Sequence, residues 1–403
     1  MTRRGPSIYT REFILLNVVL GSAAAVMALF FQFHYYLRSL GIDPRWYGFL
    51  LGADSITGIV LQPLLSPYLH GGNAKKACAA GILVMAVSLL LYNFAATPLA
   101  IACVRLVHGT GFVVLLAATM ALLASHIPPE KSGESIGVIS ITRLIPYALI
   151  PPAIVYLTGR SYGFVFICTV AAGIVLLFLI PLAFVRPISE EQRGHEISTG
   201  LKGLAQNLKS TSVMILLAVN MIFYSAYTLL FFFFRDFGAQ RGMQNPGFFF
   251  TVAMVTMIIV RLAGSRYFDR MNKARICAVS MGILAICHVA ILASRGPVAF
   301  LCLAAVFGIL WGVGIPLLFA LVFDISEPRF RGLNMNLSLV MVQAGFFAGP
   351  LVGGFMLARW GYGTLFIFCG LLNACGAAML VLPRRFRLTL PGPVMYKKSD
   401  KGE

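Results

Sequence analysis

Charged residues are scarce in this chain. Of its 403 residues only 11% are Asp, Glu, Lys or Arg, whereas 59% belong to the hydrophobic set AVILMFWYC. Soluble domains carry about 25% charged residues. The composition therefore excludes an ordinary soluble protein and indicates an integral membrane protein. The basic start of the chain leads into a long apolar stretch without a small-residue cleavage site, so we expect a retained first helix.

Sequence signals of several other protein classes are also missing. The eight cysteines form no CxxC pair and no Cys/His ligand spacing, so we expect neither disulfides nor a metal site. No cytoplasmic segment resembles GxxxxGK[ST], which argues against ATP as the energy source, and we expect no cofactor. An enzyme would need a nucleophile beside a positioned base. The six histidines show no such partner, so we predict that the chain is not an enzyme.

Acidic residues are too few to balance the basic ones, and the formal net charge is +18. The basic residues lie in short loops between apolar runs, where they set membrane topology, so we do not expect nucleic acid as a partner. With a cytoplasmic N-terminus, 22 Lys and Arg fall on the inner side and 7 on the outer side. This excess predicts that both termini are cytoplasmic. The basic C-terminal tail fits a topological role or contact with lipid headgroups.

The apolar residues form twelve runs, most of them long enough to cross about 30 Å of hydrocarbon. The runs begin near Phe13, Trp46, Lys76, Pro98, Ser135, Tyr162, Thr211, Pro246, Ala274, Pro297, Leu333 and Tyr362. The longest polar interval, residues 186–210, divides them into six plus six. We therefore predict an all-α membrane protein of twelve transmembrane helices in two six-helix pseudo-symmetric bundles, residues 1–185 and 211–403, joined by a cytoplasmic loop over residues 186–210.

The two halves also resemble each other without gaps at an offset of 199 residues. The matched pairs are Asn73 and Asn272, Cys78 and Cys277, Pro98 and Pro297, Cys103 and Cys302, Gly109 and Gly308, Gly133 and Gly332, Pro151 and Pro350, and Arg160 and Arg359. So many coincidences in one register favour a duplicated six-helix unit. Parallel repeats of this kind place a substrate site between the halves near the bilayer midplane.

With this repeat the chain resembles the major facilitator superfamily, most closely its drug:proton antiporter type. The helix-4 signature of the family is matched by Arg105, Gly109 and Gly111. A loop signature survives in the second half as Asp269, Arg270 and Lys273, for which the resemblance implies a cytoplasmic gate; the first half has lost it. The resemblance also implies a multi-pass protein of a bacterial-type inner membrane, with helices 1 and 4 lining the cavity. We expect a monomer.

Three charged residues lie deep in predicted helices, namely Asp54, Arg105 and Arg143. A charge at the centre of a membrane helix costs roughly 2.5 to 3.5 kcal/mol and usually marks a transport pathway. Asp54 and Arg105 share a level about 10 to 12 Å from the outer surface. The residues 199 positions further on are uncharged, so the deep charges are expected in the first half alone. We favour a functional role; the alternative is a structural ion pair that braces helices 2 and 4.

Helical spacing assigns further side chains to the expected cavity. Arg105 and His108 share one face of helix 4, Arg143 and Tyr147 one face of helix 5, and Gln32 and Tyr35 one face of helix 1. Aromatic surface is added by Tyr224, Tyr227, Phe231 to Phe234 and Trp311; because the four phenylalanines cover every side of their helix, we expect some to face lipid. His34 fits either an aromatic belt at the interface or a proton site, and His288 is expected to be packed in the core.

These observations predict a proton-coupled secondary transporter that exports a small organic or amphiphilic compound. The expected partners are this substrate, protons and membrane lipids. The proton-coupling candidates are Asp54 and Arg105, followed by His34 and His108. The substrate-binding candidates are Arg105, Arg143, Gln32, Tyr35, Tyr147, Tyr224, Tyr227 and Trp311. Two alternatives remain, an importer of an organic anion and a membrane sensor of the same fold that transports nothing.

Overall fold

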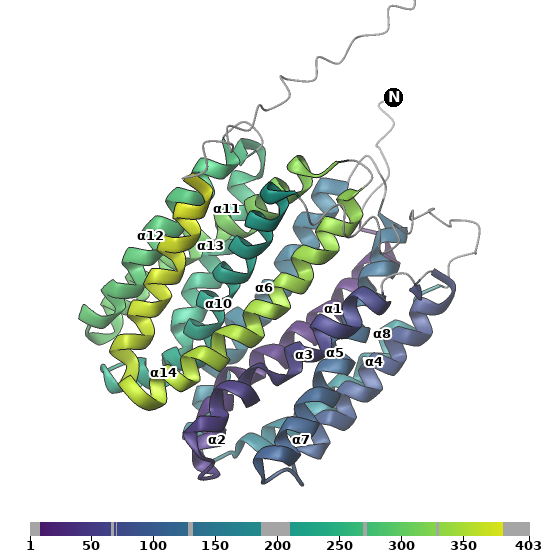
Figure 1. The fold of residues 1–403 in the computed structure, drawn as a ribbon. Coiled ribbons are helices and arrows are strands. Elements are labelled where there is room, and N and C mark those ends of the chain that lie inside the picture. Colours follow the sequence, from purple (N-terminus) through teal and green to yellow (C-terminus); the bar gives the residue numbers. More distant parts are fainter. Residues whose placement is uncertain are drawn as a thin grey trace, which may run out of the picture.

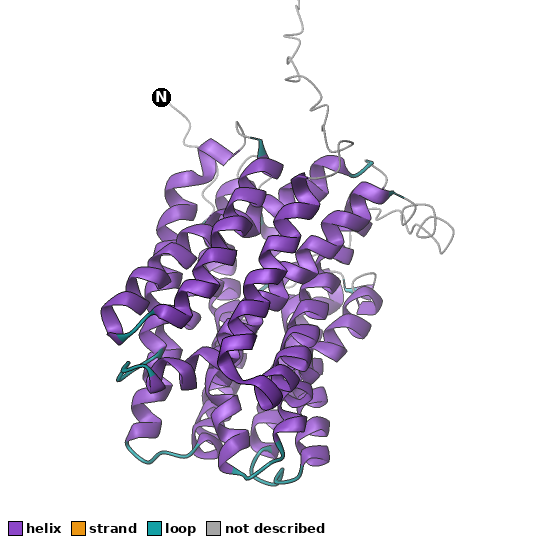
Figure 2. Ribbon diagram, turned by 60° about the vertical axis from the view of Figure 1, so that its left-hand side comes forward, coloured by secondary structure: helices purple, strands orange, loops and turns teal. Residues whose placement is uncertain are grey.

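The computed structural model describes residues 9–65, 68–69, 71–127, 132–186, 210–268, 272–327 and 330–381. Within these ranges all regular secondary structure is helical and no strand occurs (Figure 2). The predicted all-α fold class is therefore confirmed.

The helices before the central interval follow the predicted apolar runs. They are α1 (Arg11–Leu29), the 3₁₀ turn η1 (Phe30–Gln32), α2 (Phe33–Ser39), the 3₁₀ turn η2 (Pro44–Trp46), α3 (Tyr47–Leu65), α4 (Gly71–Leu91), α5 (Pro98–His126), α6 (Ser132–Gly159), α7 (Phe164–Leu177) and α8 (Leu179–Ala183). Because α1, η1 and α2 follow one another without a loop, the first apolar run is a single rod with one tight turn inside it.

The helices after the central interval are fewer and longer. They are α10 (Thr211–Gln240), α11 (Gly247–Phe268), α12 (Lys273–Ala293), α13 (Gly296–Ile325) and α14 (Arg331–Val381). The last of these bends at Gly361, whose φ of 78° lies in the left-handed region that favours glycine. The predicted runs at Leu333 and Tyr362 lie on the two sides of this bend.

Ten helices in the described ranges are long and apolar enough to cross a membrane, with α14 counted once. A shorter apolar stretch, residues 247–263, lies within α11. These lengths match a hydrocarbon core of about 30 Å at 1.5 Å per residue. The chain is therefore a multi-pass membrane protein.

The first turn of α1 and the last turn of α14 lie at the same end of the molecule (Figure 1). We call this end the termini side. The opposite end carries α2 and the bend of α14, and we call it the distal side. Positions of residues along the helices are given below relative to these two sides.

Two helix crossings repeat at the 199-residue offset. Gly109 of α5 packs against the backbone oxygen of Asp54 and the hydroxyl of Thr57 on α3. Its counterpart Gly308 of α13 packs in the same way against Ala253 and Thr256 of α11. The contacted residues are themselves 199 positions apart, so the sequence repeat corresponds to a repeated packing geometry. Glycine is required at both crossings because a Cβ would overlap the neighbouring helix.

Two close helix pairs join residues before the central interval to residues after it. On the distal side α3 meets α14, where a Cβ on Gly48 would overlap the backbone of Pro350 and Leu351. The second pair is α6 and α11, where the side chain of Asn245, two residues before α11, donates to the carbonyl of Pro152 at 2.9 Å. Thr251 Oγ1 donates to the carbonyl of Ala148 at 2.6 Å one turn deeper. These contacts hold the two parts of the chain together on the distal side.

We expect Gly109→Ala to destabilise the protein, because the added Cβ overlaps Asp54. Overpacking of this kind costs roughly 1 to 3 kcal/mol. Gly173→Ala in α7 is the matched control, since a Cβ there meets nothing within 4 Å. Losing a glycine from a helix should stabilise by about 0.5 to 1 kcal/mol. Thermal unfolding of the two purified variants in detergent tests this difference, and equal midpoints would contradict the close-packing role of Gly109.

Candidate functional site

Arg105 is wholly buried at the junction of α3 and α5. Its Nε donates to the carbonyl of Leu50 at 3.0 Å, and its Nη2 donates to the carbonyl of Leu51 at 2.7 Å and to Asp54 Oδ1 at 2.5 Å. Hydrogen bonds to charged partners are the strongest in proteins, so this set fixes the guanidinium firmly. Asp54 and Arg105, predicted to share a level, are paired directly.

Aromatic rings complete the surroundings of this guanidinium. Its central carbon lies 4.6 Å from the ring centre of Phe30 and 4.9 Å from that of Phe33. A cation over a desolvated aromatic face gains about 2 kcal/mol. The turn η1 carries Phe30, and Phe33 begins α2, so the break in the first rod places these rings beside Arg105. Within the described residues, Arg105 Nη1 is left without a hydrogen-bond partner.

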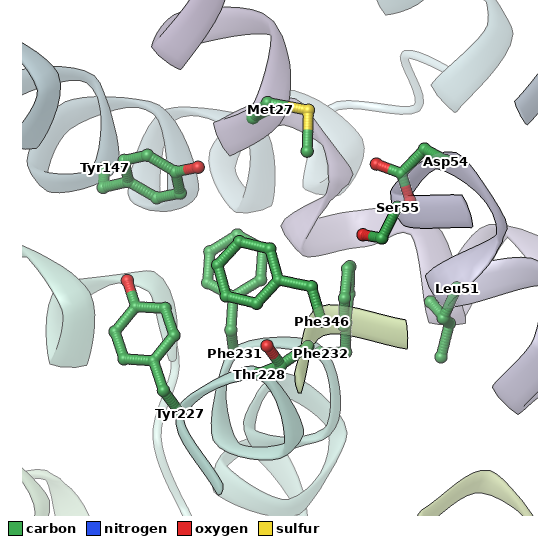
Figure 3. A pocket seen from close by; sticks show the side chains of 10 residues that line it. All are labelled: Met27, Leu51, Asp54, Ser55, Tyr147, Tyr227, Thr228, Phe231, Phe232 and Phe346. Atoms are coloured by element: carbon green, nitrogen blue, oxygen red, sulfur yellow. The ribbon is translucent and has the colours of Figure 1, made fainter. Parts of the chain in front are cut away.

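A small central cavity of about 30 Å³ lies beside this ion pair. Its lining is Met27, Leu51, Asp54, Ser55, Tyr147, Tyr227, Thr228, Phe231, Phe232 and Phe346, which come from both parts of the chain. Figure 3 shows Tyr147 and Tyr227 on one side, Asp54 and Ser55 on the other, and phenylalanine rings between them. The space suits about two water molecules. Pockets for small organic ligands are about 300 to 1,000 Å³, so the cavity must enlarge before it holds a substrate.

Asp54 lies at the boundary between the cavity and the ion pair. Its carboxylate lines the cavity while it accepts the hydrogen bond of Arg105. Arg105 itself does not line this cavity, contrary to the sequence-based expectation. The physical reason is that the carbonyls of Leu50 and Leu51 draw the guanidinium along α3, behind Asp54.

Two further predicted site residues face other helices of the first half. Gln32 Nε2 donates to Thr158 Oγ1 of α6 at 3.2 Å. His108 Nδ1 lies 3.2 Å from Ser88 Oγ of α4 and packs edge-on against Phe30. Both side chains are fully buried. The structure therefore corrects their expected placement in the cavity, because the faces on which they lie are covered by α6 and α4.

The predicted aromatic residues of the second half form one cluster. Tyr227 lines the cavity and packs against Trp311, with ring centres 4.7 Å apart. Tyr224 packs against Tyr227 and Phe346. Trp311 is 1% exposed and supports Tyr227 from behind. Of the predicted aromatic site residues, Tyr147 and Tyr227 thus reach the cavity directly.

The expectation that some of Phe231 to Phe234 face lipid is wrong. All four side chains are buried, with exposed fractions of 0 to 7%. Helix α10 packs against α14, α13, η1 and α2, and the Phe234 ring packs at a tilt against Phe249 of α11. Other helices therefore surround this part of α10 on all sides, and the four phenylalanines belong to the hydrophobic core.

Arg143 is exposed on α6. It lies on one face of this helix with Ser140 and Tyr147, and the Tyr147 ring packs against Phe231 of α10, so this face is turned toward the second half of the chain. Arg261 Nη1 in turn donates to Ser140 Oγ, one turn from Arg143. Two arginines from different parts of the chain thus approach each other beside the tyrosine cluster.

His34 is an inward-facing residue, which corrects the aromatic-belt interpretation. Its Nδ1 lies 3.0 Å from Asp236 Oδ2 of α10, and the side chain is buried between Tyr47 and Phe233. Asp236 Oδ1 also accepts a hydrogen bond from Arg235 Nη1 at 3.0 Å. This cluster links α2 to α10 on the distal side.

Tyr35 joins the same cluster from outside. It is 45% exposed, and the Arg235 guanidinium lies 4.0 Å from its ring centre. Tyr35 is therefore at the distal rim, far along the rod from the residues that line the central cavity.

Asp236 and Arg261 received no site role from the sequence, although Arg261 counts there among the arginines inside helices. Arg261 lies well inside α11, so the expectation of deep charges in the first half alone is wrong. Arg261 interrupts the apolar run of α11, and Asp236 follows the phenylalanine run of α10. A charged residue in or beside an apolar run can be recognised in the sequence. The partners could not be, because His34 and Ser140 are more than 100 residues away from Asp236 and Arg261.

The predicted cytoplasmic gate is only partly described. Lys273 Nζ donates to Asp324 Oδ2 at 2.7 Å and so links the start of α12 to the end of α13. Asp269 and Arg270 lie outside the described residues. The core assignment of His288 is confirmed, since its buried ring bonds the carbonyl of Leu284 at 2.7 Å and packs against Phe307.

Comparison with known proteins places these features in a family. Multidrug resistance protein MdtG of Proteus mirabilis is 24% identical over 359 residues, which cover 83% of this chain and 85% of MdtG. Sugar efflux transporter A of Escherichia coli is 23% identical over 374 residues, 90% of this chain and 92% of that protein. Among solved structures, the nucleoside transporter NupG matches with a TM-score of 0.75 at 15% identity, covering 92% of this chain and 100% of NupG.

These similarities extend over nearly the whole chain and agree with its helical, multi-pass architecture. The family model described as Major Facilitator Superfamily matches residues 14–333. The chain belongs to the major facilitator superfamily.

Proposed function

We propose that the protein is a secondary active transporter that exports a small organic or amphiphilic compound in exchange for protons. The observation that carries this proposal is the position of Asp54, whose carboxylate contacts both Arg105 and a cavity lined from both parts of the chain. The names of its relatives support the direction, because MdtG is a multidrug resistance protein and Sugar efflux transporter A is an efflux protein.

The proposed architecture is a pair of six-helix units, residues 1–185 and 211–403, with a cytoplasmic connection over residues 186–210. The equivalent packing of Gly109 and Gly308 supports the duplication. Counting α14 as two crossings on either side of Gly361, and α11 as one, gives the proposed twelve. We assign the termini side to the cytoplasm of a bacterial-type inner membrane, since 22 of the Lys and Arg then lie on the inner side against 7 on the outer side.

Alternating access requires the two units to move apart on one side at a time. In the present arrangement the distal side is closed by His34 and Asp236, by the contact of α3 with α14, and by that of α6 with α11. The central cavity is also too small for an organic substrate. We assign the structure to a state in which the outer entrance is closed and the binding site is collapsed.

Proton coupling follows from the chemistry of the Asp54–Arg105 pair. When Asp54 is ionised it compensates the buried guanidinium, and when it is protonated this compensation is lost. The charge balance therefore depends on the contact between α3 and α5. Any movement of α3, which also packs on α14 of the other unit, changes the proton affinity of the carboxyl group.

We predict that Asp54→Asn abolishes accumulation driven by a proton gradient while downhill exchange of substrate continues. The amide keeps the shape of the protonated acid but cannot release a proton. Wild-type protein in proteoliposomes with an entrapped pH indicator is first screened with metabolites and drugs. The variant is then tested with a compound whose transport by the wild type is accompanied by proton movement. Asp43→Asn is the matched control, because Asp43 is exposed and caps Arg45 in the distal loop.

Accumulation by Asp54→Asn with an unchanged pH dependence would show that another group, with His34 and His108 next in line, carries the proton. A wild-type protein that binds compounds but moves none across the membrane would instead favour a sensor. The screen thus separates an error in the coupling residue from an error in the function.

We also predict that Asp236→Asn opens the distal side. The substitution removes the charge that His34 and Arg235 share, and hydrogen bonds to charged groups are worth about 1.5 to 3 kcal/mol. The outward-open population should therefore rise by roughly tenfold or more. The measurement is labelling of Thr228→Cys, in the central cavity, by a membrane-impermeant thiol reagent added outside.

The labelling of the protein without the added cysteine is subtracted, because the chain has eight cysteines of its own. Asp43→Asn again serves as the control. An equal labelling rate with and without Asp236→Asn would mean that the His34–Asp236 contact does not hold the outer entrance closed.

A further inference from the structure

We infer that Arg143 and Arg261 form an anion-binding site shared by the two units, and that the transported compound is an organic anion with an aromatic body. This inference rests on the proposed transport function and names its substrate class. The sequence-based candidates for charge recognition are Arg105 and Arg143, and here Arg261 of the second unit takes the place of Arg105.

The first observation is the convergence of the two arginines. Arg143 lies on α6 and Arg261 on α11, and these helices pack against each other. Arg261 Nη1 donates to Ser140 Oγ, three residues before Arg143 on the same helix. Tyr147, one turn after Arg143 on α6, packs against Phe231 of α10 with ring centres 5.6 Å apart, so this face of α6 is turned toward the second unit. The two guanidinium groups therefore share one small region between the units.

The second observation is that their charge is not compensated. Arg105 is paired with Asp54, and Arg235 with Asp236. Across the described part of the chain, neither Arg143 nor Arg261 has a carboxylate within 4 Å. Arg261 Nε is also buried and has no hydrogen-bond partner there. A buried charge in a protein is normally paired, so the half-buried Arg261 lacks an anion, and the exposed Arg143 beside it adds a second uncompensated positive charge.

Asp54 cannot supply the missing charge in this arrangement. Its carboxylate is already bonded to Arg105 on the other side of the cavity from Tyr147 (Figure 3). Tyr147 lies between the two regions, because it lines the cavity together with Asp54 and follows Arg143 by one turn of α6. The proton site and the anion site are thus separate but adjacent.

The third observation is the nature of the surrounding wall. Tyr147 and Tyr227 line the central cavity with Phe231 and Phe346, and Tyr224 packs beside Tyr227. A planar carboxylate can accept two parallel hydrogen bonds from a guanidinium, while aromatic rings pack against an apolar body. The geometry therefore fits an aromatic carboxylate whose charged group lies at the arginines and whose body extends toward Asp54.

This site would also connect binding to the movement of the units. Without an anion, two like charges face each other across the α6–α11 contact and repel. A bound carboxylate would attract both and hold the units together on this level. The substrate then favours the closed arrangement, as alternating access requires.

Equilibrium binding of two matched probes tests the inference. The probes are 2-naphthoate and 2-naphthamide, which share shape and aromatic surface but differ in charge, and the full-length protein is purified in nanodiscs. We expect the wild type to bind naphthoate more tightly. Arg143→Gln and Arg261→Gln should each weaken naphthoate binding by about tenfold or more and leave naphthamide binding within about twofold. Arg261→Lys should retain part of the preference.

Retained naphthamide binding shows that the variants are folded, and Arg359→Gln, an exposed arginine far along α14, should change neither probe. Equal affinities of the two probes for the wild type, no naphthoate binding at all, or equal losses for both probes in the arginine variants would overturn the anion site. Binding requires no gradient. A chain that discriminates the probes but moves no compound in vesicles would refute the transport proposal alone, whereas proton-coupled movement of neutral compounds only would refute the anion site alone.

Discussion

The ion pair between Arg105 and Asp54 is the interaction on which the rest of the site depends. A guanidinium at this depth is tolerated because two backbone carbonyls, a carboxylate and two aromatic rings surround it. Removing one partner of a buried pair costs about 3 to 5 kcal/mol, whereas the intact pair adds little net stability. The pair is therefore a constraint on helix position. It requires α5 to lie directly on α3, which in turn requires glycine at position 109.

Charge compensation distinguishes the arginines that lie inside these helices. Arg105 and Arg235 each have a carboxylate partner within the protein, and both partners hold helices together. Among the described residues Arg261 contacts only a serine hydroxyl, and Arg143 is exposed. The charges of the first two are satisfied within the protein, whereas those of the last two are the ones that we propose a ligand compensates. Depth in the membrane does not distinguish them, and the sequence-based assignment of Arg105 to the substrate rested on depth, on its helical face and on the family resemblance, none of which shows how a charge is compensated.

The sequence predicted what depends on length and periodicity, and it failed where long-range contacts decide. Apolar run lengths predicted the helices, and the 199-residue repeat anticipated the equivalent crossings at Gly109 and Gly308. The level of Asp54 and Arg105 followed from counting residues. The direction of the Arg105 side chain did not, because it depends on the carbonyls of α3. The contact of His34 with Asp236, 202 residues away, could not be inferred from either local pattern. Helical spacing likewise placed His108 on the same face as Arg105 but could not show that α4 covers that face.

The size of the central cavity sets the order of events in a transport cycle. At about 30 Å³ it admits water but no organic molecule, so substrate binding and separation of the units must occur together. Asp54 lines this cavity and lies on α3, the helix that contacts both α5 and α14. Enlarging the cavity therefore moves the one helix whose position sets the Asp54–Arg105 contact. In the proposed mechanism, a change in the proton affinity of Asp54 is then a direct mechanical result of making room for substrate. It needs no separate relay, because the carboxyl group that faces the substrate space is the same one that compensates Arg105.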